Sequence, residues 1–187
     1  SATLDSLRGG PEWESLAEAV RQMEAQADQT AILSRLIGSA AELAPRVVLF
    51  VLKGGVLTGS AGRGFPAGFA PRSVIIPAGS NCSVELARSE GDFVLEPASA
   101  RPENRALLDA LGGQPIEWML AAPLWIRDRV AAVLYADTPD AGDWHPDPIR
   151  VLASVAALSL EAVPARARHP RPQPAPPVEA PAHHLLP

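Results

Sequence analysis

The sequence has one cysteine, one lysine and few aromatic residues. Cys82 is alone, so neither an intramolecular disulfide nor a cysteine-rich metal site can form, and we expect a reducing, cytoplasmic setting. Aromatic residues make up 5% of the 187 residues, although 47% are apolar. The 16 Lys and Arg against 21 Asp and Glu give a formal charge of −5, which disfavours nucleic acid as a partner.

The sequence also lacks long apolar runs. The longest ones, residues 47–52 and 130–136, fall far short of the roughly 18 residues that a membrane-spanning helix needs. The chain shows neither the basic-then-apolar pattern of a signal peptide nor a lipidation motif, and we expect no membrane partner. Three of the four histidines, His169, His183 and His184, fall in a proline-rich stretch, so we predict no metal site and no cofactor.

One long helix is predicted over residues 11–44. Pro11 suits its first turn, and Pro45 ends it. Apolar residues recur along it at spacings of three and four, with a shift of phase after Thr30. This narrow seam fits either packing on the helix's own domain or pairing with the same helix of a second subunit. We expect a homodimer whose interface contains Leu16, Val20, Met23, Ala27, Leu33 and Leu36.

Residues 45–163 are predicted to alternate strands and helices. A strand over 46–53, buried on both faces, turns at Gly54-Gly55 into a second strand over 56–61. Short strands at 72–77 and 93–95, short helices at 82–89 and 102–111, a hairpin over 116–138 and a closing helix over 147–163 follow. This order predicts an α+β domain in which helices pack on one antiparallel sheet.

The two ends of the chain differ from this middle part. Residues 1–10 are predicted to be a disordered N-terminus. From Pro164 to Pro187, proline recurs among Arg, His and Ala, a composition that buries too little apolar surface to offset the entropy lost on ordering. We predict a disordered tail or linker there, which could bind a protein partner as an extended segment.

The order of these elements resembles the GAF domain, a sensory module related in shape to PAS. The resemblance is carried by residues 46–65, 79–88, 122–136 with the strand Ala-Pro-Leu-Trp-Ile, and 144–163. It implies a GAF-like antiparallel sheet with helices packed on it, in a bacterial signalling protein, and a ligand covered by residues 78–89 and 96–114. The candidate pocket residues are Arg63, Phe65, Cys82, Glu85, Arg101, Glu117 and Trp118.

Cys82 is the one nucleophile that the sequence singles out. The start of a helix suits a reactive thiol, but a lone cysteine more often packs as a small apolar group, and we favour that interpretation. GAF proteins that reduce free methionine sulfoxide rely on several cysteines, whereas this chain has one. Lys53 lacks the Asn-Lys-Phe-Asp-Glu signature of cyclic-nucleotide binding, and Ser83 stands where bilin attachment would need a histidine beside the cysteine.

No nucleophile elbow, dinucleotide fingerprint or phosphate loop occurs in the sequence. We therefore expect that the chain is not an enzyme but a noncatalytic GAF-like regulatory domain, which binds a small ligand or assembles as a homodimer. A purely structural interaction scaffold without a ligand is the alternative. A redox enzyme or sensor that uses Cys82 is a distant third.

Overall fold

Six strands form one antiparallel sheet in the computed structural model, which describes residues 11–142 and 144–168. The spatial order is β3-β2-β1-β6-β5-β4. The strands are β1 (Arg46–Lys53), β2 (Val56–Arg63), β3 (Ile75–Ile76), β4 (Val94–Pro97), β5 (Trp118–Ile126) and β6 (Arg129–Thr138). The predicted α+β class with one antiparallel sheet is confirmed.

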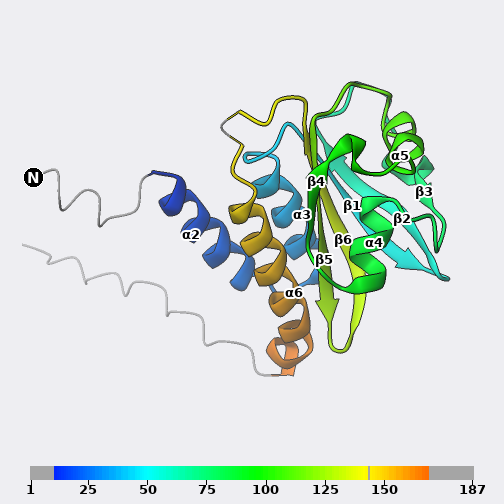
Figure 1. The fold of residues 1–187 in the computed structure, drawn as a ribbon. Coiled ribbons are helices and arrows are strands. Elements are labelled where there is room, and N and C mark those ends of the chain that lie inside the picture. The colour runs from blue at the N-terminus through cyan, green and yellow to red at the C-terminus, as the bar shows by residue number, and fades with distance from the viewer. Residues whose placement is uncertain (1–10, 143, 169–187) are drawn as a thin grey trace, which may run out of the picture.

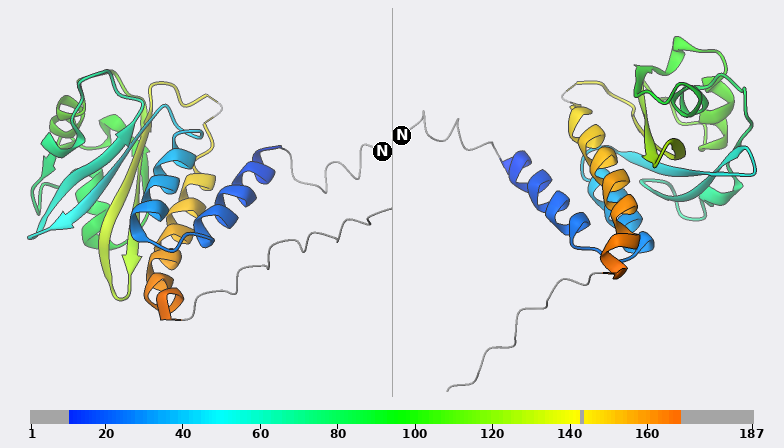
Figure 2. Two further views of the ribbon diagram at one scale, coloured as in Figure 1. Left: turned by 180° about the vertical axis from the view of Figure 1, so that it is seen from behind. Right: turned by 90° about the horizontal axis from the view of Figure 1, so that it is seen from below.

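Helices cover both faces of this sheet (Figure 1). On one face lies the helix layer, which consists of α2 (Pro11–Glu24), α3 (Gln29–Ala40) and α6 (Asp147–Arg168). On the other face lie α4 (Ser83–Glu90) and α5 (Asn104–Ala110). The views from behind and from below in Figure 2 show the same arrangement, with the sheet between the two groups of helices.

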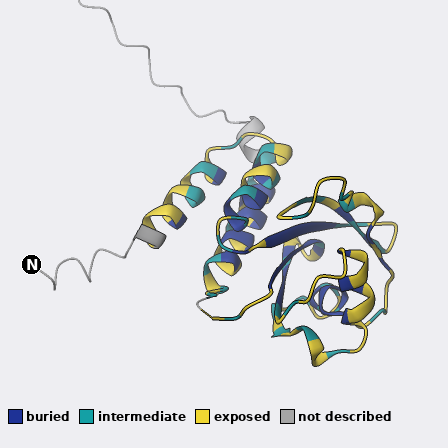
Figure 3. Cartoon of the chain, turned by 90° about the horizontal axis from the view of Figure 1, so that it is seen from above, coloured by how far each residue is buried: buried dark blue, intermediate teal, exposed yellow. Residues whose placement is uncertain are grey.

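Strand β1 lies inside the sheet, between β2 and β6, and apolar side chains cover both of its faces. Val47 and Leu49 pack into the core under the helix layer, while Val48 and Phe50 pack into the core under α4 and α5. The alternation follows from the two-residue period of a strand. Figure 3 shows the resulting band of buried residues through the middle of the molecule. The predicted turn at Gly54-Gly55 is present, with φ angles of 57° and 86° that favour glycine.

The single long N-terminal helix was a wrong prediction. The chain forms two helices, α2 and α3, and Asp28 is the N-cap of the second, where its side chain accepts a hydrogen bond of 2.8 Å from the Ala31 N–H. An aspartate that satisfies a free N–H at a helix start favours a new helix there over continuation of the old one. The shift of apolar phase in the sequence falls close to this break.

The break also changes the surroundings of the residues that were predicted to form the dimer interface. Helix α2 packs against both α3 and α6 of its own chain. Met23 and Leu36 are 0% exposed there and Leu16 is 8% exposed, so three of the six assigned residues belong to the core. Val20 and Leu33 are half-buried, and Ala27 lies exposed in the connection between the helices. The assignment of Leu16, Met23 and Leu36 to a dimer interface is therefore corrected.

The closing helix is longer than predicted. It was expected to end at Val163, but α6 continues to Arg168 with Pro164 inside it. A proline inside a helix removes one N–H and crowds the carbonyl oxygen four residues earlier, yet the helix continues through Pro164, which is exposed. The predicted disordered tail began at Pro164, and this boundary is wrong because residues 164–168 belong to α6. The rest of that tail, residues 169–187, and the predicted disordered N-terminus, residues 1–10, lie outside the described residues. In the part that the structure describes, no helix is both long and apolar enough to cross a membrane.

The packing of α2 on its own domain leads to a stability prediction. Met23→Ala should lower the free energy of unfolding by about 2–5 kcal/mol, since it removes a fully buried side chain. The neighbouring exposed change Glu24→Ala is the control and should stay within about 0.5 kcal/mol of the wild type. Urea unfolding measures both. A Met23→Ala protein as stable as the wild type would show that α2 does not dock on the domain.

Candidate ligand groove and the polar contacts beneath it

A buried ion pair crosses the sheet between β1 and β6. Arg46 and Asp137 stand opposite each other in the strand register and are 3% and 0% exposed. The guanidinium donates from Nε to Oδ1 at 2.8 Å and from Nη2 to Oδ2 at 2.5 Å. The Tyr135 hydroxyl also donates to Asp137 Oδ2 at 2.5 Å. The carboxylate is thus held by three donors on the face of the sheet that α4 and α5 cover.

Arg46 also contacts residues that lie outside the sheet. Its Nη1 donates to the carbonyl oxygen of Leu111, just after α5, at 3.2 Å, and its guanidinium lies 5.1 Å from the centre of the Phe65 ring. Burial disfavours the charged guanidinium, yet the hydrogen bonds and charge of Asp137 raise the pKa of Arg46. Burial and the nearby carboxylate hold the pKa of Tyr135 well above its usual value. Arg46 therefore stays charged while it ties α5 to the sheet.

A second polar cluster, partly buried, joins α4, β4 and α5. The Ser83 N–H, at the start of α4, donates to Asn104 Oδ1 at 2.9 Å, so a side chain of α5 caps α4. The Ser83 hydroxyl lies 2.6 Å from Glu96 Oε1, and Arg101 Nε donates to the same oxygen at 2.9 Å. Ser83 and Asn104 are both 0% exposed. This cluster fixes the beginning of α5 as Arg46 fixes its end.

The side chain of Glu85 binds the loop that precedes α4. Its buried carboxylate accepts 2.7 Å hydrogen bonds from Arg88 and a 2.9 Å bond from the Gly79 N–H. Burial works against the charged carboxylate, but Arg88 and the Gly79 N–H together lower the pKa of Glu85. The loop before α4 therefore rests on a charged side chain that is fully engaged within the protein.

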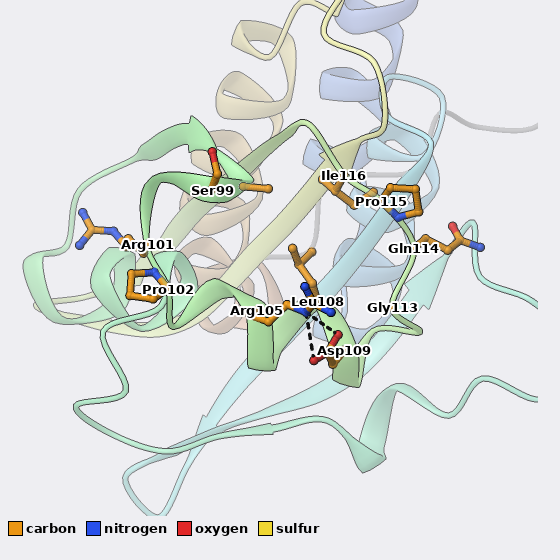
Figure 4. Close-up of a pocket in the computed structure, with 11 residues that line it drawn as sticks. Ser99, Arg101, Pro102, Arg105, Leu108, Asp109, Gly113, Gln114, Pro115 and Ile116 are labelled. Atoms are coloured by element: carbon orange, nitrogen blue, oxygen red, sulfur yellow. Dashed lines mark hydrogen bonds and ion pairs between the residues drawn. The ribbon is translucent and has the colours of Figure 1, made fainter.

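A groove of about 570 Å³ runs along α5, and we refer to it as the α5 groove (Figure 4). Leu108 points toward its centre, and Arg105 and Asp109 form an ion pair of 3.1 Å at its mouth. Its lining consists of Ala98, Ser99, Arg101, Pro102, Arg105, Leu108, Asp109, Gly113, Gln114, Pro115 and Ile116. Apolar side chains and a few polar groups thus meet in one depression, a composition typical of small-molecule sites.

Cys82 lines a smaller cavity of about 90 Å³ between β3 and α5. The thiol is 2% exposed and lies 3.5 Å from the Ser80 hydroxyl. Cys82 is the N-cap residue of α4, although its side chain makes no capping bond. Its neighbours in the core include Val74, Ile76 and Leu107. The thiol is therefore enclosed largely by apolar side chains in this structure.

The seven pocket residues predicted from the sequence do not gather in one place. Arg101 lines the α5 groove, and Cys82 lines the smaller cavity. Glu85 lines neither of them, and its carboxylate is bound to Arg88 and to the Gly79 N–H. Phe65 is half-buried and stacks on Phe69 with ring centres 4.1 Å apart.

The other three predicted pocket residues lie near the ends of strands. Arg63 is exposed at the end of β2, and Trp118 is half-buried at the start of β5. Glu117 is exposed, and its Oε2 accepts a 3.0 Å hydrogen bond from the Ala141 N–H. None of the three lines the α5 groove or the Cys82 cavity. Among the described residues, no group of three or more His, Cys, Asp or Glu could hold a metal ion.

Sequence reasoning missed most of the polar residues that hold this side of the sheet together. Arg46 begins one apolar run and Asp137 ends another, and a charged residue at the end of a buried strand is the one sequence signal by which they could have been found. Glu96 and Asn104 carried no comparable signal. Their roles depend on how β4, α4 and α5 meet.

The arrangement of strands and helices is similar to that of solved GAF domains. A GAF domain of a phosphoenolpyruvate-protein phosphotransferase from Coxiella burnetii gives a TM-score of 0.66 at 15% identity, over 84% of this chain and 94% of that one. A GAF domain/HD domain protein from Geobacter sulfurreducens gives 0.59 at 18% identity, over 76% and 98%. No family model and no curated protein matches the sequence. The chain has the GAF fold, as the resemblance predicted.

Enzymes share this fold as well. The free methionine-R-sulfoxide reductase of Neisseria meningitidis, solved with its substrate, gives a TM-score of 0.64 at 19% identity, over 82% of this chain and 90% of that one. Reductases from Staphylococcus aureus and Thermoplasma acidophilum are also similar. This finding contradicts the prediction that the chain is not an enzyme, because the same fold serves catalysis in those proteins, and we withdraw that prediction.

The buried ion pair leads to a second stability prediction. Asp137→Asn should cost about 3–5 kcal/mol of folding free energy, because it leaves the Arg46 charge buried without a counter-charge. The double variant Arg46→Met with Asp137→Leu removes both charges and should cost less than the single change. Urea unfolding of the three proteins decides this. Equal stability of Asp137→Asn and the wild type would contradict the role assigned to the pair.

Proposed function

We propose that the chain is a sensory or regulatory domain of a bacterial signalling protein and that it binds a small ligand in the α5 groove. The observation that carries the proposal is the groove itself, because about 570 Å³ lies in the range of small-molecule sites. The likeness to a methyl-accepting chemotaxis protein and to a GAF domain/HD domain protein supports a role in signalling.

The chemistry of the groove favours a small ligand with an apolar body and polar substituents. Leu108, Pro115 and Ile116 offer apolar contacts, and Ser99 and Gln114 offer hydrogen-bonding groups. Arg105 and Asp109, at 82% and 57% exposure, bond to each other where water competes strongly. An exposed pair of this kind contributes little to stability, so a ligand could replace either partner at low cost.

The floor of the groove is held in place before any ligand binds. Arg46 holds the end of α5 at Leu111, and Asn104 holds its beginning through Ser83. Both contacts are buried, so α5 has little freedom to shift on the sheet. Preorganisation of this kind reduces the entropy that binding must overcome.

A scaffold without a ligand is the alternative function, and the dense packing beneath α4 supports it. Between the sheet and α4, the space is filled by large side chains, among them Phe50, Met119 and Tyr135, all 0% exposed. The Cys82 cavity of about 90 Å³ is too small for most metabolites. Ligand binding in this protein therefore depends on the α5 groove rather than on the space beneath α4.

The proposal is tested by thermal unfolding of the protein against a collection of small metabolites. A ligand present at 100 times its dissociation constant should stabilise the fold by about 2.7 kcal/mol. Ser99→Trp, which places a large side chain in the groove, should abolish that stabilisation. Ser60→Trp, at an exposed position of β2 outside the groove, is the matched control and should retain it.

Two results would overturn the proposal. A ligand that stabilises both tryptophan variants equally binds somewhere other than the α5 groove. If no metabolite stabilises the wild type, and native mass spectrometry of protein purified without refolding finds no retained small molecule, the scaffold alternative replaces the proposal.

A methionine sulfoxide reductase is the second candidate, favoured by the similar enzymes and by the position of Cys82 in a cavity. In this reaction the thiol of Cys82 would take the sulfoxide oxygen, leaving methionine and a sulfenic acid on Cys82. An external dithiol would then return Cys82 to the thiol, releasing the oxygen as water and ending as its own disulfide. Because Cys82 is 2% exposed, the substrate could enter only if α5 or the loop at Ser80 moves.

This second candidate predicts that the protein, with dithiothreitol, converts free methionine-R-sulfoxide to methionine. The Cys82→Ala variant should lose the activity completely, while Ser60→Trp should keep it. Product is measured by chromatography. Equal product formation by the wild type and Cys82→Ala would exclude Cys82 as the nucleophile.

A further inference from the structure

The Cys82 cavity opens to solvent through an apolar mouth. Ile75 of β3 is 59% exposed there, and Ala106 and Ala110 of α5 are exposed on the other side, while Leu107 is buried deeper inside. An isoleucine exposed to this extent leaves apolar area in water that burial would remove favourably. The cavity holds about 90 Å³, which is small for a metabolite but leaves room for a single aliphatic side chain.

One carboxylate also lines the Cys82 cavity. Glu103 directly precedes α5 and is exposed. Among the described residues, its carboxylate has no hydrogen-bond or ion-pair partner, whereas arginines hold Glu85 and Glu96. Apolar surface and one unpaired negative charge therefore meet at the mouth of the cavity. They suit a segment that carries an aliphatic side chain and a hydrogen-bond donor on one face.

The chain contains such a segment beyond α6. Residues 169–187 follow this helix and lie outside the described part of the chain, and large aliphatic residues are few among them. Leu185-Leu186 comes directly after His183-His184, and we refer to these four residues as the His-Leu segment. A proline-rich segment in the extended polyproline conformation has three residues per turn, so residues three apart share one face. His183 and Leu186 are such a pair.

We propose that the His-Leu segment docks on its own domain, with the Leu186 side chain in the Cys82 cavity and the His183 imidazole against the Glu103 carboxylate. The leucine then also covers Ile75, and the imidazole N–H donates to a carboxylate that has no partner in the described part of the chain. One segment thereby satisfies both the apolar and the charged part of the cavity mouth.

The chain is long enough for this contact. Helices α6 and α5 lie on opposite faces of the sheet, so the chain must pass around an edge of the sheet to reach the cavity (Figure 1). At about 3.1 Å per residue, the chain from Arg168 at the end of α6 to Leu186 extends to about 55 Å. A folded domain of this size is roughly 40 Å across, so the length suffices.

A covalent connection favours this occupant over a separate molecule. One buried leucine and one hydrogen bond would hold a free peptide only weakly, because a free peptide loses its translational freedom on binding. A flexible connection keeps the His-Leu segment at an effective concentration of about millimolar around its own domain. The expected occupant is therefore the segment of the same chain rather than that of a second copy.

The docking is independent of the proposed ligand, because the two cavities use different faces of α5. Ala106 and Ala110 line the Cys82 cavity, whereas Arg105 and Asp109 line the α5 groove. A ligand in the groove and the His-Leu segment in the Cys82 cavity can thus be present together. The segment does cover the entrance that a substrate of Cys82 would use.

Disulfide formation with the native Cys82 tests the docking in the full chain. Under an oxidising glutathione mixture, Leu186→Cys should form an intramolecular disulfide with Cys82, because the replaced side chain lies in the cavity that Cys82 lines. Leu185→Cys is the matched control, since it has the same reach but faces away from the cavity, and it should react at least ten times more slowly. Peptide mapping without reduction, followed by mass spectrometry, measures both rates.

Two further changes test the site itself in the Leu186→Cys protein. Ala106→Trp places a large side chain in the mouth of the cavity and should slow disulfide formation at least tenfold, while Ser60→Trp, at an exposed position of β2, should leave the rate unchanged. Glu103→Gln removes the charge at the mouth and should slow the reaction about threefold. Unchanged circular dichroism spectra show that each variant is folded.

Three results would overturn the proposal. Equal rates for Leu186→Cys and Leu185→Cys would show that the segment has no fixed position on the domain. An unchanged rate in folded Ala106→Trp protein would place the contact outside the cavity. A rate that rises with protein concentration, together with disulfide-linked dimers, would show that the segment docks on a second copy instead of its own domain.

Discussion

The ion pair between Arg46 and Asp137 is the contact on which the α5 side of the molecule depends. Two charges in a site that is almost fully buried are costly unless their hydrogen bonds are satisfied. Here Asp137 accepts from Arg46 and Tyr135, while Arg46 reaches on to Leu111 after α5. The two central strands, β1 and β6, are thereby joined to the helix that forms the groove. Loss of either charge would leave the other unpaired in the core.

The segment that leads into Arg46 is also connected to the helix layer. Pro45 precedes Arg46, and a Cβ atom at Gly64 would lie 1.8 Å from the Pro45 carbonyl oxygen, so only glycine fits in this close approach. Two residues before Pro45, the Leu43 carbonyl oxygen accepts a 3.0 Å hydrogen bond from the indole of Trp144, which precedes α6. The α5 groove and the start of α6 are thus attached, on opposite faces of the sheet, to one short segment between α3 and β1.

The strands were predictable because their signals are local. An apolar run and a Gly-Gly turn define β1 and β2, and the apolar strands on either side of Arg127 define the β5–β6 hairpin. The helix break at Asp28 was missed because a continuing apolar seam outweighed one N-cap residue. The site was largely missed because its contacts are long-range. Arg46 and Asp137 lie 91 residues apart, and Ser83 and Asn104 lie 21 apart, so their pairing follows only from the fold.

Amide hydrogen exchange of an Arg46→Lys variant tests most directly whether this ion pair holds the groove. Lysine keeps the positive charge near Asp137 but lacks the fork that also reaches the Leu111 carbonyl oxygen. The account predicts faster exchange in α5 and at Leu111 and Gly113 than in the wild type, while Ile32 and Leu36 in α3 keep their protection. Unchanged exchange throughout α5 would contradict the claim that Arg46 fixes the groove to the sheet.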